Sequence, residues 1–303
     1  MKACVIINPV AGPGRKRTVG VCIDAAKSIL GRHQYDVDVR ITGGPGDAFR
    51  FASDAVASGC ELVVAWGGDG TVNGAASAVA RTATTLAIVP GGSGNGLARD
   101  LGVPFNPTAA LQIAGGGTTR AIDAGELHGS LFFNVAGIGF DARIAARLAE
   151  PGVRRGLLGY VLATFDEMRR YEPGAYSIRN ARDVTGQSQM PDIVDRSALF
   201  IALANSRQYG SGAQIAPKAL LDDGMIEIVV VEPQSGFSIL RQVPDFFRGT
   251  LNERPGLLMR SASSMDISST HPITFHVDGE PRKGPSNISL RTRRGALSVR
   301  VGR

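Results

Sequence analysis

Three glycines surround one aspartate at the point where an apolar segment ends. Val63-Val64-Ala65-Trp66 runs into Gly67-Gly68-Asp69-Gly70-Thr71, and a helix-compatible stretch follows. Glycine adopts positive φ angles at little cost and lets a ligand approach the backbone closely. Free N–H groups at the start of a helix attract anions. The carboxylate of Asp69 could contact a metal ion or a reacting hydroxyl. The pattern therefore favours phosphate chemistry over a turn without a ligand.

A second glycine loop follows about twenty residues later. Leu86-Ala87-Ile88-Val89 leads into Pro90-Gly91-Gly92-Ser93-Gly94-Asn95-Gly96-Leu97-Ala98, again from an apolar segment through glycines into a helix pattern. The hydroxyl of Ser93 and the amide of Asn95 suit contacts with phosphate or ribose. Two loops of this kind favour a ligand site over two unoccupied turns.

A third loop lies near the N-terminus. The apolar segment from Ala3 to Ile7 runs into Asn8-Pro9-Val10-Ala11-Gly12-Pro13-Gly14, followed by Arg15-Lys16-Arg17. It is not a Walker A loop, because no Gly-Lys-Ser/Thr ends it. Its glycines and cations suit phosphate, although Gly-Pro-Gly before a helix is usually just a turn when it stands alone.

Length and composition indicate an ordinary globular protein. The 303 residues suffice for two domains, and 43% of them are hydrophobic and 20% charged. The net charge of +6 and pI near 9.5 favour anionic partners: nucleotides, anionic lipid surfaces or nucleic acid. No run reaches the roughly 18 apolar residues of a membrane span, and the first residues lack a signal-peptide pattern. The three cysteines and four histidines show no metal-binding or redox spacing, which favours a cytosolic protein with reduced thiols.

The first 120 residues alternate strand and helix patterns, which is typical of a mostly parallel sheet with helices on both faces. All three loops follow the carboxyl ends of strands, where such sheets bind ligands. The expected strands are 3–7, 36–41, 61–66 and 86–89. The expected helices are 15–30, 46–58, 71–80, 94–101 and 107–114.

The pattern changes after Gly115-Gly116-Gly117, and residues 121–303 read as a β-rich second domain with antiparallel strands. The polar segment from Asp183 to Asp195 reads as a loop or hairpin tip. The expected strands are 119–127, 131–136, 175–181, 196–204, 225–232, 257–262, 264–269, 273–277, 286–291 and 296–301. The expected helices are 139–149, 156–171 and 236–248.

Seven patches together resemble the diacylglycerol kinase catalytic family, which also holds sphingosine kinases, ceramide kinases and bacterial lipid kinases. The Gly-Ser-Gly-Asn-Gly-Leu-Ala form of the second loop looks closer to sphingosine and ceramide kinases. The patches are Asn8-Pro9 to Gly12, Gly67 to Asn73, Pro90 to Arg99, Asn134 to Ala142, Asn205 to Pro217, Asp222-Asp223-Gly224-Met225 and Asp278-Gly279-Glu280.

The resemblance implies an α/β fold class with two domains. Residues 1–120 would form a nucleotide-binding α/β domain, and residues 121–303 an antiparallel β-sandwich that binds lipid. The active site would lie in the cleft between them, and the last strand could return to the first domain. By resemblance, ATP would lie against Asn8, Pro9, Gly12, Thr42, Gly67, Gly68, Asp69, Gly70, Thr71, Asn73, Gly92, Ser93, Gly94 and Asn95.

The same resemblance assigns catalytic carboxylates. Asp69 would contact Mg²⁺, which prefers oxygen ligands. Asp278 or Glu280, after the strand 273–277, would accept the proton of the lipid hydroxyl. An isolated Asp-Gly-Glu is otherwise a hairpin turn. Asp123 matches a further carboxylate near the family's cleft, with a solvent-facing strand residue as the alternative.

The remaining polar candidates are cations and a second metal loop. Arg15, Lys16, Arg154 and Arg155 could contact phosphate or simply be solvated. Asp222, Asp223 and Met225 resemble a structural Mg²⁺ loop of bacterial relatives. This chain has Leu220 where those relatives carry an acidic ligand, so a plain β-turn remains an alternative.

Gly137-Ile138-Gly139-Phe140-Asp141-Ala142 fits a dinucleotide-binding fingerprint, but no strand pattern follows to close a βαβ unit. In the family these glycines allow close packing. Arg169-Arg170, at the end of the helix pattern 156–170, could meet anionic headgroups. A hydrophobic slot for the lipid could be lined by Phe132, Phe133, Phe140, Leu157, Leu158, Val161, Phe165, Phe246 and Phe247, each of which also suits ordinary core.

The sequence therefore predicts an ATP- and Mg²⁺-dependent kinase that phosphorylates a diacylglycerol, sphingoid or ceramide type of lipid. Two alternatives stay open: an NAD kinase, which shares the Gly-Gly-Asp-Gly-Thr loop, and a non-catalytic nucleotide- or lipid-binding regulator. We expect a lipid partner and no nucleic acid. We also expect a cytoplasmic location, peripheral at the inner face of the membrane. A homodimer is one option for the assembly.

Overall fold

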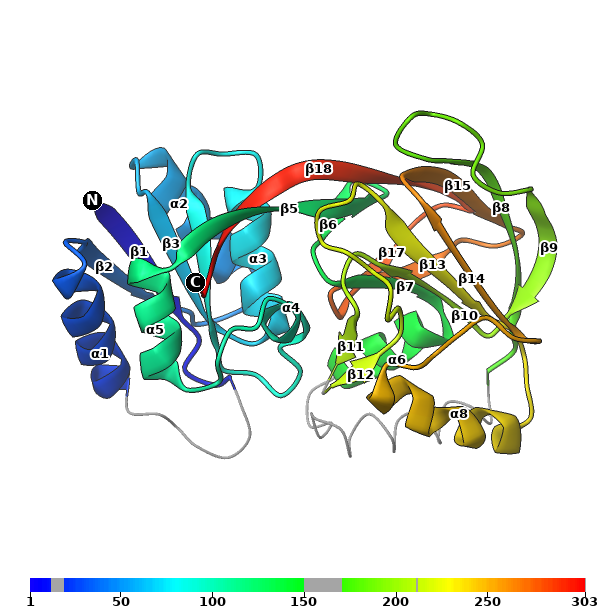
Figure 1. The fold of residues 1–303 in the computed structure, drawn as a ribbon, viewed down its shortest axis with the longest axis horizontal. Coiled ribbons are helices and arrows are strands. Elements are labelled where there is room, and N and C mark those ends of the chain that lie inside the picture. The colour runs from blue at the N-terminus through cyan, green and yellow to red at the C-terminus, as the bar shows by residue number, and fades with distance from the viewer. Residues whose placement is uncertain (12–18, 150–170, 211, 303) are drawn as a thin grey trace. The chain divides into compact units, whose positions relative to one another are not determined.

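The computed structural model describes residues 1–11, 19–149, 171–210 and 212–302, which divide into two compact units (Figure 1). The first unit comprises Met1–Ile122 and Gly295–Arg303, and the second Asp123–Arg294. The chain passes between them in strands β5 (Thr118–Leu127) and β18 (Asn287–Val301). The first unit thus ends two residues beyond the expected boundary and includes the end of the last strand.

Some expected features lie outside the described residues: Gly12, the cations Arg15, Lys16, Arg154, Arg155, Arg169 and Arg170, the helix 156–171 up to residue 170, and the apolar residues Leu157, Leu158, Val161 and Phe165. No helix among the described residues has the length and apolar character that a membrane crossing requires.

The first unit is built on a parallel sheet with strand order β2-β1-β3-β4, and β18 lies parallel to β4 at its end. β1, β3 and β4 are buried along almost their whole length, as expected for parallel strands covered on both faces. The outer strand β2 is more exposed. The strands are β1 (Lys2–Ile7), β2 (Asp36–Ile41), β3 (Leu62–Gly67) and β4 (Thr85–Pro90).

Helices connect these strands. α1 contacts α5, and α2 contacts α3, so two helix pairs pack on the sheet. The start of α5 follows from its sequence, because the Asn106 side chain accepts the N–H groups of Thr108 and Ala109 and Pro107 occupies the first turn. The helices are α1 (Val19–Arg32), α2 (Asp47–Ala57), α3 (Asp69–Val79), α4 (Gly96–Asp100) and α5 (Pro107–Gly116).

The second unit is an antiparallel β-sandwich, which confirms the predicted fold class. One sheet has the order β14-β13-β10-β7-β16-β17, and the other contains β18, β15, β8 and β9 with β5 and β6. Their inner faces enclose a core that includes Phe132, Phe275, Ile228 and Leu290. β11 and β12 form a separate two-stranded sheet.

The elements of this unit not yet given are β6 (Ser130–Phe132), β7 (Val135–Gly139), α6 (Phe140–Ala149), β8 (Gly174–Arg182), β9 (Ile193–Ala198), β10 (Phe200–Ala204), β11 (Gln208–Gly210), β12 (Ala213–Gln214), β13 (Ile226–Val231), α8 (Gly236–Arg248), β14 (Leu257–Ala262), β15 (Ser264–Ser269), β16 (Thr274–Val277) and β17 (Glu280–Lys283).

Four expected strands differ from the structure. The segment 131–136 is broken at Phe133-Asn134, and 196–204 is broken at Leu199, where the chain leaves one sheet for the other. Conversely, 286–291 and 296–301 are parts of one strand, β18. Local patterns do not reveal these features, because pairing partners far away in the sequence decide where a strand breaks or continues.

Candidate active site

The two glycine loops of the first unit pack backbone against backbone. β3 and β4 are neighbours, so their loops lie side by side, and the Gly91 N–H donates to the Gly67 carbonyl at 2.7 Å. A Cβ atom on Gly92 would lie only 2.6 Å from the Gly68 Cα. No side chain fits there without moving backbone. These glycines are therefore required for contact between the loops, whatever ligand they bind.

Asp69 ties the same loops together. It opens α3, and its carboxylate accepts hydrogen bonds from the backbone N–H groups of Asn95, at 2.9 Å, and Gly96, at 2.8 Å. Gly96 begins α4, so the Asp69 side chain, which belongs to α3, accepts N–H groups at the start of α4 that have no partner within that helix. A Cβ on Gly94 would lie 2.6 Å from the Asp69 carboxylate. Each oxygen of Asp69 keeps a further lone pair, and a hard oxygen donor fits Mg²⁺.

Asn95 closes the second loop from within. Its backbone is left-handed, with φ of 53°, and its side chain is 3% exposed. The side-chain amide exchanges two hydrogen bonds with Gly92, one as acceptor at 2.9 Å and one as donor at 2.6 Å. The amide expected to face a ligand thus shapes the loop instead. Arg99, which was not among the predicted site residues, braces the loop through the Gly94 carbonyl at 2.9 Å.

The described start of the N-terminal loop joins this arrangement. The Asn8 amide donates to the Thr71 hydroxyl at 3.2 Å, and the Asn8 backbone N–H donates to the Trp66 carbonyl at 2.9 Å. Thr42 donates its backbone N–H to the Ile7 carbonyl at 2.9 Å. The residues that follow β1, β2 and β3, all predicted to contact a nucleotide, therefore lie close together in the first unit.

A small cavity of about 10 Å³ lies at these strand ends, which holds about one water molecule. A nucleotide would therefore lie over the loops. Gly70 and Ser93 are exposed there, and Pro9, Gly68, Gly92 and Gly94 are partly exposed. Thr71 and Asn73 are buried, at 7% and 8% exposure. The cavity is lined by Ile7, Asn8, Pro9, Ala11, Val19, Cys22, Trp66 and Gly91.

In the second unit, Asp278 and Gly279 form the turn of the β16–β17 hairpin, with φ angles of 48° and 86°. The Asp278 carboxylate accepts three backbone N–H groups, from Phe133 and Asn134 at 2.9 Å and from Val135 at 3.0 Å. Phe133 and Asn134 form the interruption between β6 and β7, and Val135 begins β7. The aspartate therefore compensates for the break in the expected strand 131–136.

Glu280 differs from its neighbour. It is exposed at the first position of β17, and its side chain makes no hydrogen bond or ion pair to the described part of the chain. The sequence left open whether Asp278-Gly279-Glu280 is an acidic motif or a hairpin turn, and in the structure the acidic motif lies in a hairpin turn. Asp278 holds the turn in place, and Glu280 leaves it with a carboxylate accessible to solvent.

A buried pair, His276 and Asp141, lies next to the β16–β17 turn and contacts it. The Nε2 atom of His276 lies 2.6 Å from Oδ2 of Asp141, and the two residues are 6% and 4% exposed. The Gly279 N–H donates to Nδ1 of His276 at 3.3 Å, which places the proton of the neutral imidazole on Nε2. A Cβ on Gly137 would lie 1.9 Å from the Asp141 carboxylate. The Gly137–Ala142 motif therefore serves packing, not a dinucleotide.

Two opposing effects determine the pKa of His276. Burial alone would lower this pKa, but the Asp141 carboxylate, with a further contribution from Asp278, raises it above its ordinary value. The Gly279 hydrogen bond, which only the neutral ring accepts, opposes this rise. Nothing in the sequence spacing joins His276 to Asp141, because the two lie 135 residues apart.

Asp123 is 2% exposed, so the solvent-facing alternative is wrong. Its carboxylate accepts the Gly224 N–H at 2.6 Å, and its own N–H donates to the Leu221 carbonyl at 2.7 Å. It therefore lies beneath the turn that holds Asp222 and Asp223. Burial, then the nearby Asp123 and Asp222, raise the pKa of Asp223.

The second metal loop has few free oxygens. The Asp223 carboxylate accepts the Met225 N–H at 2.9 Å, and Asp123 already accepts the Gly224 N–H. In residues 1–11, 19–149, 171–210 and 212–302, no group of three His, Cys, Asp or Glu residues is arranged to hold a metal ion. Backbone hydrogen bonds stabilise this turn without an ion, and Mg²⁺ at Asp222, Asp223 and Met225 stays a prediction.

The aromatic residues proposed to line a lipid slot lie mostly in the core. Phe132 and Phe133 are fully buried, and Phe140 is 5% exposed. Phe246 packs against a second core cluster. Phe247, in contrast, is 46% exposed and lies on the surface.

Comparisons with known proteins agree with this architecture. A family model described as "Diacylglycerol kinase catalytic domain" matches residues 2–127, and "YegS C-terminal NAD kinase beta sandwich-like domain" matches residues 134–301. The "Probable lipid kinase YegS-like" of Pseudomonas syringae pv. syringae (strain B728a) is 33% identical, covering 88% of this chain and 84% of that protein. The "Probable lipid kinase YegS" of Shigella boydii serotype 18 is 30% identical, covering 94% and 93%.

A crystal structure of a putative diacylglycerol kinase from Bacillus anthracis str. Sterne is also similar, with a TM-score of 0.77 and 25% identity, covering 99% of this chain and 97% of the other. The second description compares residues 134–301 with the β-sandwich of NAD kinases, whereas the similar whole proteins are named lipid kinases. The chain therefore belongs to the diacylglycerol kinase catalytic-domain family, as a lipid kinase that phosphorylates a lipid hydroxyl.

Proposed function

We propose that this lipid kinase transfers the γ-phosphate of ATP, with Mg²⁺, to the hydroxyl of a diacylglycerol or of a sphingoid or ceramide type of lipid. The observation that carries the proposal is the pair of glycine loops joined by Asp69. Phosphoryl transfer requires that phosphates be held, charge be neutralised and the attacking hydroxyl be aligned.

The loops supply the first requirement. Backbone N–H groups around Gly68, Gly70 and Ser93 can face the phosphates, because side chains are absent or small there. The Asp69 hydrogen bonds to Asn95 and Gly96 hold both loops in one geometry before ATP arrives. Mg²⁺, when bound, supplies positive charge beside the phosphates, and Asp69 is the carboxylate at the loops that would hold it.

The proton of the lipid hydroxyl requires a base, and the hydrogen bonds support Glu280. The Asp278 carboxylate accepts three backbone N–H groups, whereas the Glu280 carboxylate makes no hydrogen bond within the described residues. A base must reach the proton that it removes, so the exposed carboxylate suits this role better. Asp278, His276 and Asp141 would then be positioning residues for the turn.

The partners follow from the substrate class. We propose peripheral attachment at the inner, cytoplasmic face of a membrane, because an amphiphilic acceptor resides in a bilayer. The net charge of +6 suits anionic lipids. No nucleic-acid partner is proposed, and a homodimer remains an option.

The direct test incubates the purified protein with radiolabelled ATP, Mg²⁺ and mixed micelles that contain diacylglycerol, sphingosine, ceramide or monoacylglycerol. A labelled lipid product is expected, and it identifies the acceptor class. Label on NAD alone, in a parallel tube, would contradict the proposal. Binding of ATP without transfer to any acceptor would favour the regulator instead.

A further inference from the structure

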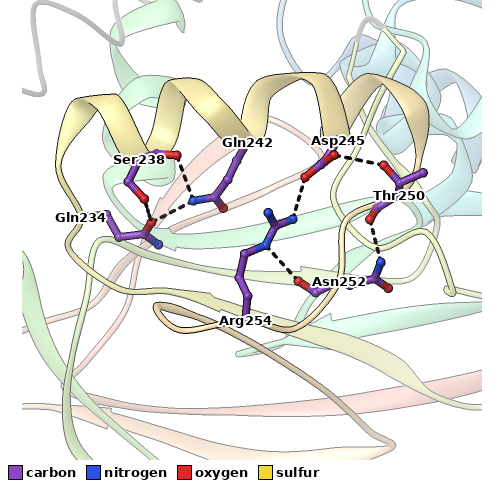
Figure 2. Close-up of polar contacts among 7 residues, drawn as sticks. All are labelled: Gln234, Ser238, Gln242, Asp245, Thr250, Asn252 and Arg254. Carbon is purple, nitrogen blue, oxygen red and sulfur yellow. Dashed lines mark hydrogen bonds and ion pairs between the residues drawn. The ribbon is translucent and has the colours of Figure 1, made fainter.

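Helix α8 presents polar side chains to the protein body. Gln242 is only 7% exposed, and its Nε2 donates to Oε1 of Gln234 at 2.8 Å. The Ser238 hydroxyl donates to the same oxygen at 2.8 Å, and Gln234 donates to the Gly256 carbonyl at 2.8 Å. Figure 2 shows the contacts among Gln234, Ser238 and Gln242 beneath the first turns of the helix. The N-terminal half of α8 is thus attached by hydrogen bonds.

The C-terminal half is attached in the same way. Arg254 donates to the Asp245 carboxylate at 2.9 Å, and the Thr250 hydroxyl donates to the same carboxylate at 3.2 Å (Figure 2). The hydrogen bond from Arg254 is the main reason that the pKa of Asp245 is lowered. Two polar anchors therefore fix one face of α8 against the segment 250–256 that precedes β14.

The opposite side of α8 is apolar and exposed. Val243 and Phe247 are 40% and 46% exposed, and they lie four residues apart, on one face of the helix. Pro244 between them is also exposed. Arg241 and Arg248 lie next to this stripe and are exposed as well.

This arrangement departs from the usual pattern, in which a surface helix buries its apolar stripe and exposes its polar face. Phe246 does pack inward, but the polar Gln242 is buried whereas Val243 and Phe247 are exposed. Each other large exposed hydrophobic residue among the described ones is alone on its helix, strand or loop, as single residues commonly are. On α8 two occur together, although a polar face is available and is turned inward. The orientation of the helix therefore favours an apolar partner with a charged rim.

We infer that α8 docks on the surface of an anionic lipid bilayer, with Val243 and Phe247 in the boundary between headgroups and acyl chains. A helix of 13 residues is about 20 Å long and can lie in the plane of that boundary. Arg241 and Arg248 are seven residues apart, so they lie on the same side of the helix, next to the stripe, where they match anionic headgroups. The inference rests on the proposed function for its reason, because a lipid kinase meets its substrate at a membrane.

Sedimentation with sucrose-loaded vesicles of phosphatidylcholine and phosphatidylglycerol, without ATP, tests the inference. The wild-type protein should sediment with the vesicles. Phe247→Gln should reduce the partition coefficient about tenfold, the order expected when one large apolar side chain no longer leaves water. Phe247→Leu should retain most of the binding. Val194→Gln is the matched control, because Val194 is 54% exposed on β9, and it should bind like the wild type.

A spectroscopic test places the residue itself in the bilayer. The chain has one tryptophan, Trp66, which is 3% exposed, so a Phe247→Trp variant adds one reporter over a nearly constant background. The emission of this added indole should shift to the blue on addition of the same vesicles and be quenched by brominated lipids. Circular dichroism should show that the variants keep the wild-type fold.

Equal sedimentation of wild type and Phe247→Gln, or an added indole in Phe247→Trp that stays in water, would overturn the inference. Absence of wild-type binding to these vesicles would also overturn it. Since the vesicle assays contain no ATP, they do not depend on phosphate transfer. A protein that docks through α8 but phosphorylates no acceptor would contradict the proposed function and not the docking surface.

Discussion

The Nε2 atom of His276 lies 2.6 Å from Oδ2 of Asp141, inside the second unit and directly below the turn that leads to Glu280. Gly137 leaves the space for this contact, and the Gly279 N–H reaches the other nitrogen of the ring. A buried ion pair is costly to break, because removal of one partner leaves the other without compensation. The pair therefore acts as a support for the candidate base.

His276→Gln should lower the free energy of unfolding by about 3 to 5 kcal/mol near pH 6, since Asp141 would lose its buried partner. The pKa of His276 is raised in the folded protein. Its contribution to stability is then fully present below about pH 6.5, the ordinary pKa of histidine, and is lost as the pH rises through the raised value. Urea denaturation of both proteins at pH 6 and pH 9 measures the difference, and a difference independent of pH would contradict this account.

Asp69→Ala should abolish turnover and also cost about 1 to 3 kcal/mol of stability, because two backbone N–H groups lose their acceptor. Steady-state kinetics and denaturant unfolding give the two quantities. Asp24→Ala, at an exposed position of α1, is the control and should change neither. Normal turnover of Asp69→Ala would remove Asp69 from the catalytic machinery.

Glu280→Gln should reduce kcat by on the order of 10²-fold or more with little change in stability, in line with the usual contribution of a general base. Asp278→Asn should mainly destabilise the protein, by about 1 to 3 kcal/mol, because an amide cannot accept at both positions as the carboxylate does. The two variants should be compared by kcat and by thermal unfolding. The reverse result, with kcat lost only in a stable Asp278→Asn protein, would make Asp278 the base.

Gly92→Ala should weaken ATP binding and lower stability, because its Cβ would meet the Gly68 backbone at 2.6 Å. Gly31→Ala provides a matched control. Gly31 lies in α1 with no atom within 4 Å of a built Cβ, so alanine should be neutral or stabilise the helix by up to about 1 kcal/mol. Isothermal titration with ATP and thermal unfolding measure both effects. If Gly92→Ala bound ATP with wild-type affinity, close contact between the two glycine loops would not be required for ATP binding.

Raising the salt concentration should weaken binding to anionic vesicles, because the Debye length falls from about 10 Å at 0.1 M to about 3 Å at 1 M. Part of the binding should persist, since Phe247 would contribute an apolar term that salt does not screen. The salt series should be run for wild type and Phe247→Gln. Complete insensitivity to salt in the wild type would rule out a role for Arg241 and Arg248.

The sequence by itself determined the two-domain plan, the parallel and antiparallel classes of sheet and the family. These properties depend on local signals: apolar segments that end in glycine loops around Asp69 and Ser93, and helix signals such as Asn106-Pro107 before α5. Short-range periodicity and turn chemistry carry such information directly.

Only the tertiary structure decided what most of the polar residues contact. Asp69 binds backbone groups 26 and 27 residues away, Asp278 compensates for a strand break near Asn134, and His276 pairs with Asp141 across 135 residues. The polar face of α8 likewise turns inward because Asp245 binds Arg254, which lies in the loop after the helix. A residue's type limits what it can bind, but its partner depends on how distant strands pair and bring backbone donors together.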